Sequence, residues 1–261
     1  MRRYAELYPY FLRNQIKLIL EYRADFIVGL VALFLVQGAN LATLWVITRQ
    51  VPTINGWTLP ELVLIYGLII FCRSFSHMFC ENTWVIGHLI REGEFDRFLV
   101  RPIDPLFHTL ASGMNWEGVG NFLLGGALLL TSGRALGIFS SWFNIAYLVV
   151  AVASGAVIFF ALNLLTGSTA FWIIESIPVS AAVFENYLFA HYPLSIYPRA
   201  IQFLLTWIIP YGFASFYPAA FLLGRDLGPV VWLGPLVAAV LLALAYRLWL
   251  AGLGRYEGTG S

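Results

Sequence analysis

The sequence predicts an all-α polytopic membrane protein with six transmembrane helices, organised as a single transmembrane domain over residues 1–261. Of its residues 60% are hydrophobic and 11% are charged, whereas about a quarter of an average soluble domain is charged. Three long runs, 26–48, 135–174 and 200–224, carry no charge. A helix crosses the hydrocarbon core of a bilayer with about 20 apolar residues, so these runs are long enough to span. The alternating strands of a membrane β-barrel are not evident.

The first 24 residues predict an interfacial amphipathic helix that precedes the first span. Leu12, Ile16, Ile19 and Leu20 recur at spacings of three and four, which places them on one helical face. The basic residues that flank this face are Arg2, Arg3, Arg13, Lys17 and Arg23. An apolar face with basic flanks is typical of a helix that lies in the headgroup plane.

Six spans are expected at about 25–48, 60–82, 106–131, 143–164, 167–188 and 230–250. Asn55-Gly56 provides a turn after the first span, and Pro60 stands near the start of the second, where a proline is tolerated. A break near Thr166-Gly167 is expected to divide the charge-free run 135–174 between the fourth and fifth spans.

The segment 190–225 is apolar but rich in prolines, of which Pro210 and Pro218 interrupt its longest run. Broken helix at membrane depth persists only where protein or a cavity satisfies the freed backbone groups. This segment is therefore expected to be a re-entrant or broken-helix element on the extracellular side, placed before the last span.

The distribution of basic residues predicts the orientation. With six spans the termini lie on one side, and the inner segments then carry ten Arg or Lys residues against four in the outer segments. The inner ones are Arg2, Arg3, Arg13, Lys17, Arg23, Arg91, Arg97, Arg101, Arg247 and Arg255, and the outer ones are Arg49, Arg134, Arg199 and Arg225. We expect a multi-pass protein of the cytoplasmic (inner) membrane with both termini in the cytoplasm.

Residues 91–104, here called the island, hold seven charged residues among fourteen. A short amphipathic helix is expected from Glu94 to Arg101, with Phe95, Phe98 and Leu99 on the face that holds it to the membrane domain. Pro102 should stop this helix. One interpretation is a solvated loop that only sets topology. The mixed signs favour a second interpretation, a surface that docks a protein in a fixed orientation.

A family resemblance rests on the run Gly93-Glu-Phe-Asp96, followed by Leu99, Arg101-Pro102 and Pro105-Leu106. It resembles a signature of ABC transporter permeases of the type-2 exporter class, which have six spans and no fused ATPase. Supporting similarities are spread over Arg3 to Phe26, at Gly56-Trp57 and at Arg255-Tyr256, so that the resemblance covers nearly the whole chain. Asn121 departs from the family, in which an Asp is expected at that position.

The resemblance implies a half-transporter. Two permease subunits, identical or related, would sit in the lipid bilayer on two cytoplasmic ABC ATPase subunits, with ATP and Mg bound by the ATPases and no cofactor on this chain. It assigns the ATPase-coupling role to the island, beside the N-terminal helix. The coupling residues are Arg91, Glu92, Glu94, Phe95, Asp96, Arg97, Phe98 and Arg101. The net charge of +1 gives no indication of a nucleic-acid partner.

The chain lacks the sequence features needed to hydrolyse ATP itself. A phosphate-binding P-loop requires a lysine that follows a glycine-rich loop. The only lysine is Lys17, and no such loop precedes it. The ATPase is therefore expected to be a separate chain.

Arg73, His77 and Glu81 recur every four residues along the second predicted span and should share one helical face. Three interpretations stay open: a charge ladder facing the protein interior, a proton or substrate path, and snorkelling to the interface. Glu117 and Glu175 are candidate partners of Arg73. The second interpretation supports an alternative function, a secondary transporter or channel. An intramembrane enzyme is disfavoured because no catalytic motif is present.

Smaller features are interpreted structurally. Cys72 and Cys80 are expected to fill helix positions. Ala151 and Gly155 form a small-xxx-small pair that lets two helices approach closely. The tryptophans near the predicted span ends, which should anchor the interfaces, are Trp45, Trp57, Trp142, Trp232 and Trp249.

Overall fold

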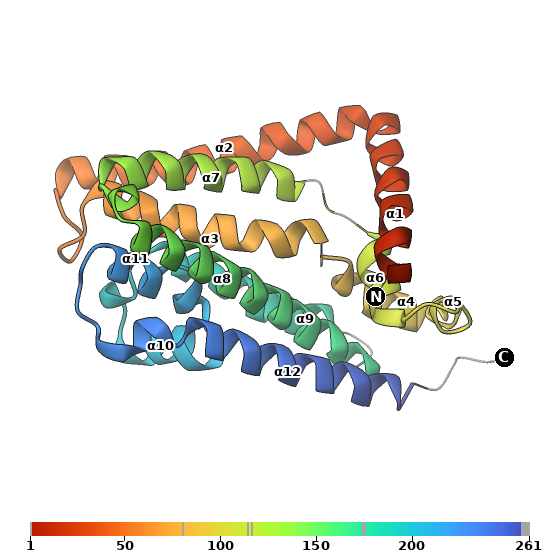
Figure 1. Cartoon of the computed structure of the whole chain (residues 1–261). Helices are drawn as coiled ribbons and strands as arrows, with labels where there is room; N and C mark the ends of the chain where they lie inside the picture. The colour runs from red at the N-terminus through yellow and green to blue at the C-terminus, as the bar shows by residue number, and fades with distance from the viewer. Residues whose placement is uncertain (1, 80, 114, 116, 174–175, 257–261) are drawn as a thin grey trace.

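The computed structural model describes residues 2–79, 81–113, 115, 117–173 and 176–256. The described residues form helices and no β-strand, which confirms the all-α class. Four of the helices are long and apolar enough to cross a membrane: α2 (Arg23–Gln50), α3 (Leu59–Phe79), α8 (Trp142–Ser168, extended by a 3-10 turn to Phe171) and α12 (Gly234–Leu253). In Figure 1 these helices run side by side along the length of the molecule.

The N-terminal segment is a helix, as predicted. Helix α1 (Arg2–Glu21) ends at Glu21, and the chain turns sharply at Tyr22 into α2. Figure 1 shows α1 lying across the direction of the long helices, at the end of the molecule where both termini lie. This crosswise orientation is that of a helix resting on a surface from which the long helices extend.

The predicted third span, 106–131, is wrong as one continuous helix. It is divided into α6 (Pro105–Ser112) and α7 (Glu117–Ala135). Helix α6 stops because Gly113 has an extended backbone, with φ −136° and ψ 130°. The second predicted span also ends early, at Phe79, and continues as a 3-10 turn (Glu81–Val85) and as α4 (Ile86–Arg91).

Helices α3 and α7 pack antiparallel at close range, because glycine replaces a side chain at the contacts. A Cβ at Gly67 would lie 3.2 Å from the backbone nitrogen of Leu129, and one at Gly125 would lie 2.8 Å from that of Phe71. Small residues allow such close packing of membrane helices, where hydrophobicity does not drive association between them. The pair α3–α7 thus forms a tightly packed part of the fold.

The predicted break near Thr166-Gly167 lies close to the end of α8, which stops at Ser168 and passes into the 3-10 turn Thr169–Phe171. Gly167 also serves as a contact, since a Cβ there would lie 2.6 Å from the backbone oxygen of Thr83. The fifth predicted span, 167–188, is not one helix. Its place is taken by the end of α8, by α9 (Ile177–Phe184) and by a 3-10 segment (Glu185–His191).

This broken segment nevertheless runs antiparallel to α3 along its length. Phe184 packs on Trp84 with ring centroids 5.1 Å apart, and His191 stacks on Tyr66 at 4.5 Å. Between them the Arg73 guanidinium lies 4.2 Å from the ring centroid of Tyr187. Residues later in this segment thus contact residues earlier in the sequence of α3 and the turn after it. The chain therefore returns toward the other end of the molecule.

The segment 190–225 consists of short helices, as predicted. They are 3-10 turns at Leu194–Ile196 and Tyr211–Ala214, α10 (Arg199–Phe203), a π-helical turn (Leu204–Ile208) and α11 (Phe216–Leu222). Tyr211, Phe213 and Ala219 are almost fully buried in it. Protein therefore surrounds this irregular backbone, which is the condition for its survival at membrane depth.

An ion pair fixes the end of this segment to the start of α3. Arg225 donates to both carboxylate oxygens of Glu61 at 3.1 Å and to the carbonyl of Gly56 at 2.7 Å. Its guanidinium also lies 3.8 Å from the ring centroid of Trp57, in a cation–π contact.

Helix α12 follows a 3-10 turn (Gly228–Trp232) and packs parallel to α8. Gly234 at the beginning of α12 lies beside Ser154 in the middle of α8, and at the other end of α12 Trp249 packs on Phe171 with centroids 5.3 Å apart. Gly155 of the predicted small-residue pair permits a close approach as expected, because a Cβ there would lie 2.6 Å from Cys72 Sγ. Cys72 is buried in this contact, and Cys80 lies outside the described residues.

Candidate functional site

The island projects from the end of the molecule that also holds both termini and α1 (Figure 1). It begins at the end of α4, turns at Gly93, where φ is +70°, and continues as α5 (Asp96–Leu99). The predicted helix from Glu94 to Arg101 is therefore too long. The helix ends at Leu99, three residues before Pro102, with Val100 as its C-cap.

Phe95 anchors the island to the transmembrane helices and is fully buried. Its ring packs on Phe171 at 5.6 Å, on Trp249 at 6.2 Å and on Tyr256 at 5.1 Å, all in edge-to-face geometry. Phe98 stacks on Phe95 at 5.9 Å. Aromatic pairs of this kind add stability beyond the apolar area that they bury. The predicted anchoring role of Phe95 and Phe98 is thus consistent with their packing.

A hydrogen bond supports the same attachment. Tyr256 donates its hydroxyl to Asp96 Oδ1 at 2.8 Å. Burial, the hydrogen bond to the Asp96 carboxylate and the negative charge of that carboxylate together raise the pKa of Tyr256 to about 12. The phenol therefore keeps the proton with which it holds Asp96.

Leu99 does not belong to the anchor, contrary to the prediction. Its side chain is 41% exposed, and that of the next residue, Val100, is 82% exposed. Because α5 has a single turn, only Phe95 and Phe98 can face inward together. Leu99 and Val100, here called the island tip, form an exposed apolar projection.

Exposed charged pairs lie in the same segment as the island tip. Arg97 pairs with Glu94 at 2.6 Å and Arg91 with Glu92 at 3.5 Å, all four being well exposed. An apolar centre within a charged rim is the usual anatomy of a protein–protein interface. Arg101 is also exposed, and its guanidinium donates to Nε2 of His108 at 3.0 Å.

His108 joins the island to α6 and α1. Its ring packs on Phe98 at 4.3 Å and on Phe11 at 5.9 Å. It is 4% exposed, and its Nδ1 atom has no hydrogen-bond partner among the described residues. Burial lowers the pKa of His108, and the positive charge of Arg101 lowers it further. The imidazole is therefore neutral at physiological pH.

Helix α6 and α1 form one platform beside the island. Asp104 caps α6 by accepting from the Phe107 backbone at 2.9 Å, and Pro105 occupies its first turn. Tyr4 packs on Phe107 with centroids 4.7 Å apart, and Gln15 donates to Ser112 O at 2.6 Å. Tyr4, Phe11 and Gln15 thus join α1 to α6, whereas Ile16 and Leu20 of the predicted apolar face are exposed at 47% and 69%.

The predicted charge ladder on α3 is only partly assembled. Arg73 and His77 share α3, but Glu81 begins the 3-10 turn after the helix has ended, so the three do not follow one helical register. Glu117 is the first residue of α7, and Glu175 lies outside the described residues, as do the positions of the Glu81 and Glu117 side chains. The described contact of Arg73 is the cation–π contact with Tyr187.

His77 belongs to a chain of hydrogen bonds that crosses three helices. Tyr66 donates to Gln37 Oε1 at 2.5 Å, and Gln37 donates to Asn121 Oδ1 at 3.3 Å. Asn121 in turn lies 3.4 Å from His77 Nδ1, and Asn115 lies 3.2 Å from His77 Nε2. An uncharged amide at position 121 thus bridges α2 and α3 through α7.

A second polar contact joins α8 to α3. Asn163 donates to Ser76 Oγ at 2.5 Å and accepts from Trp84 Nε1 at 2.9 Å. A cavity of about 20 Å³ lies beside these groups and is lined by Arg73, His77, Trp84, Asn163 and Phe184. A space of this size holds one water molecule.

The sequence interpretation overlooked the interior amides Gln37 and Asn163, the exposed Val100 and the buried His108. The amides could have been noticed, because each is an isolated polar residue within a charge-free apolar run. Nothing in the sequence distinguishes Val100 from the buried apolar residues nearby. Among the described residues no three His, Cys, Asp or Glu side chains are grouped so that they could hold a metal ion.

Comparison with known families agrees with this arrangement. Residues 34–260 match the family described as ABC-2 family transporter protein, which is well over half of the 261 residues. A comparison with curated proteins finds no significant match. The match includes the island and all four long apolar helices except the first part of α2. The chain therefore belongs to the ABC-2 transporter family, as a multi-pass membrane permease of an ABC transporter.

Proposed function

We propose that this chain is the permease half of an ATP-driven exporter, and that the island docks on a separate cytoplasmic ATPase. Closure of the ATPases on ATP and Mg would move the island, and the island would move the transmembrane helices. The observation that carries the proposal is the island itself: an exposed apolar tip at Val100, within paired charges, fixed to the helix ends through Phe95.

The anchor gives the proposed movement a physical route. Phe95 contacts Phe171 at the end of α8 and Trp249 at the end of α12. Interiors packed at this density transmit displacement with little compression. A push on the island would therefore reach two long helices together, and it would reach α1 through the contacts of His108 and Phe11.

The orientation follows from the charge count and the geometry. We propose six crossings, made by α2, α3, α7, α8, the broken segment 177–191 and α12. The termini and the island lie at one end of the molecule (Figure 1), so the ten-to-four excess of basic residues applies to that end. That end is the cytoplasmic one in this proposal, in the inner membrane, and a second permease subunit, identical or related, completes the transporter.

A charge placed on the island tip tests this proposal. Val100→Asp should abolish co-purification of a P-loop ATPase from the native host, because it places a charge at the centre of the apolar contact. The protein should still insert and fold, since Val100 is 82% exposed. The measurement is pull-down of the tagged chain, followed by identification of the ATPase and assay of ATP hydrolysis in the complex.

The matched control is Val51→Asp, at an exposed valine (53%) that ends α2 at the opposite end of the molecule. It adds the same charge and should leave the complex intact. Retention of the ATPase by Val100→Asp, or its equal loss from both variants, would contradict docking at the island.

The alternative of a secondary transporter or channel receives less support. It requires a path past Arg73 and His77, whereas the described space beside them is about 20 Å³. His77 is also engaged by Asn115 and Asn121. We interpret these groups as an interior hydrogen-bond network that orients α2, α3 and α7.

A further inference from the structure

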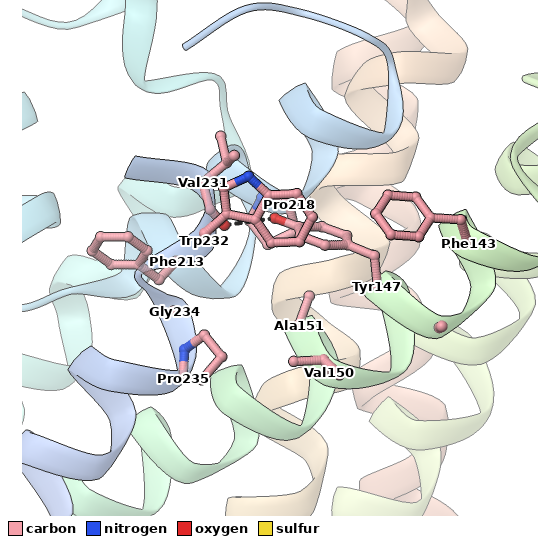
Figure 2. Close-up of a pocket in the computed structure, with 11 residues that line it drawn as sticks. Phe143, Tyr147, Val150, Ala151, Phe213, Pro218, Val231, Trp232, Gly234 and Pro235 are labelled. Carbon is pink, nitrogen blue, oxygen red and sulfur yellow. Dashed lines mark hydrogen bonds between the residues drawn. The ribbon is translucent and has the colours of Figure 1, made fainter. Parts of the chain in front are cut away.

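An apolar pocket lies at the end of the molecule opposite the island, between the beginnings of α8 and α12. Figure 2 shows the rings of Phe143, Tyr147, Phe213 and Trp232 around it, with Pro235 at the start of α12. Its volume is about 210 Å³. The short helices of the segment 190–225 close one side with Phe213 and Pro218, so the pocket is formed by parts of the chain that are far apart in sequence.

The lining selects a hydrocarbon occupant. The hydroxyl of Tyr147 is already engaged, because it donates to the Val231 carbonyl at 2.8 Å. The other side-chain polar atom of the lining is the indole nitrogen of Trp232, a residue that is 51% exposed and stands at the rim. An occupant would therefore find apolar contacts inside and one hydrogen-bond donor at the mouth, as interfacial tryptophans provide for lipid.

The size of the pocket favours a chain over a whole drug-like molecule. A cavity of about 150 Å³ lined by apolar side chains accommodates benzene. Pockets for drug-sized ligands start at about 300 Å³. A volume of about 210 Å³ lies between these limits and suits a segment of an aliphatic chain.

The depth of the pocket points to the bilayer as the source. Helix α8 has 27 residues and is thus about 40 Å long, whereas the hydrocarbon core is about 30 Å thick. The lining residues of α8 lie between Phe143 and Ala151, in its first third. Trp142 and Phe143 beside the mouth are exposed at 80% and 58%. The mouth therefore opens at the boundary between headgroups and acyl chains.

We propose that this pocket binds one acyl chain of a membrane phospholipid from the leaflet at the end opposite the island. The chain fills the space between α8, α12 and the segment 190–225, and its ester group lies near the indole of Trp232. This inference does not depend on docking of an ATPase.

Photo-crosslinking tests the site directly. The purified chain is reconstituted in phosphatidylcholine nanodiscs that contain a trace of phospholipid with a diazirine on its acyl chain. After illumination, labelled peptides are mapped by mass spectrometry. The expected result is label concentrated on 143–151 and 231–235, well above the label on the exposed lipid-facing residues Val240 and Leu244 of α12. Label spread evenly over all exposed apolar positions would mean that lipid acts only as solvent and would overturn the proposal.

A pair of alanine variants supplies the control. Ala146→Phe places a ring in the pocket, and Ala239→Phe places one on the lipid-facing side of α12, outside it; both alanines are exposed. The pocket label should be lost in Ala146→Phe and retained in Ala239→Phe. Persistence of the label in Ala146→Phe would refute the site. If Ala146→Phe fails to fold, Val150→Phe fills the same space from another lining position.

A third arm distinguishes the source of the chain. A free fatty acid with the same diazirine is added to the reconstituted protein in place of the labelled phospholipid. Label in the pocket from the phospholipid supports a bound membrane lipid. Label from the free fatty acid alone would show a site for a separate amphiphile and would overturn the lipid assignment.

Discussion

Phe95 shows how much of the island depends on one side chain. The residue is fully buried, and its contacts come from residues at positions 98, 171, 249 and 256. Its neighbours Glu94 and Arg97 face solvent and can be exchanged at little cost in stability, because an exposed ion pair contributes little. Stability and recognition are therefore assigned to different residues within the island.

Phe95→Ala should detach the island from the helix ends. Removal of a buried phenylalanine costs about 3–5 kcal/mol, so the purified protein should unfold at a lower temperature and should lose the ATPase as well. The control is Phe203→Ala, at a phenylalanine of α10 that is 57% exposed, which should change the unfolding temperature little. An unchanged unfolding temperature for Phe95→Ala would show that the aromatic cluster does not hold the island.

His108 makes the junction of the island, α6 and α1 sensitive to acid. Its pKa is lowered in the folded protein by burial and by Arg101, whereas an unfolded histidine titrates near about 6.5. Below that pH the unfolded chain binds the proton more readily than the folded chain does. The contribution of His108 to stability is thus complete above about pH 6.5 and declines as the pH falls below it.

The unfolding temperature of the wild type should therefore fall between about pH 7.5 and about pH 5 by more than that of His108→Gln, because glutamine does not titrate. Intrinsic fluorescence during heating in detergent measures both. Arg101 and the rings of Phe11 and Phe98 face His108 in this junction. Parallel pH profiles for the two proteins would exclude His108 as the group responsible.

At the scale of elements, the segment 190–225 is fastened at its end by the pair of Arg225 and Glu61. The two side chains are 31% and 15% exposed, so water screens the pair only in part. Arg225 also contacts Trp57 and the carbonyl of Gly56, which lie in the turn before α3. The start of α3 and the end of the segment 190–225 are thereby held as one unit.

A double-mutant cycle measures this attachment. Glu61→Ala and Arg225→Ala should each lower the unfolding temperature, and the double variant should lose less than the sum of the two, because either change alone breaks the same pair. A coupling of about 1 kcal/mol is expected for a partly exposed pair of this kind. Strict additivity would mean that the ion pair contributes nothing to the attachment.

At the scale of the whole molecule, composition was sufficient to predict helices that span a membrane, an N-terminal helix and a separate charged island. Each of these features is predicted from the hydrophobicity or the charge of many consecutive residues. The errors occur where local backbone geometry decides the outcome. Gly113 ends α6 with an extended backbone, whereas Gly125 lies within α7, where a Cβ would lie 2.8 Å from the Phe71 nitrogen. Both are glycines, and sequence alone does not distinguish a glycine at a break from a glycine at a contact.

The candidate site divides in the same way. The charges and aromatic residues of the island could be recognised from their density in the sequence. The contact of Arg101 with His108 and the outward position of Leu99 could not, because they depend on where α5 ends and on the buried imidazole of His108. Likewise, the sequence shows Asn121 only as a departure from the Asp expected in the family. Its contacts with Gln37 and His77 could not be predicted, because they depend on how three helices pack together.

The pocket of Phe95 has a consequence for biogenesis. Its walls include Trp249 and Tyr256, which a ribosome adds more than 150 residues after Phe95 itself. The island therefore cannot take its final position while the chain is still being made, since long-range contacts form only when both partners exist. A nascent or prematurely terminated chain would enter the membrane with an unseated island. Completion of the last helix thus determines when a newly made subunit becomes ready for assembly.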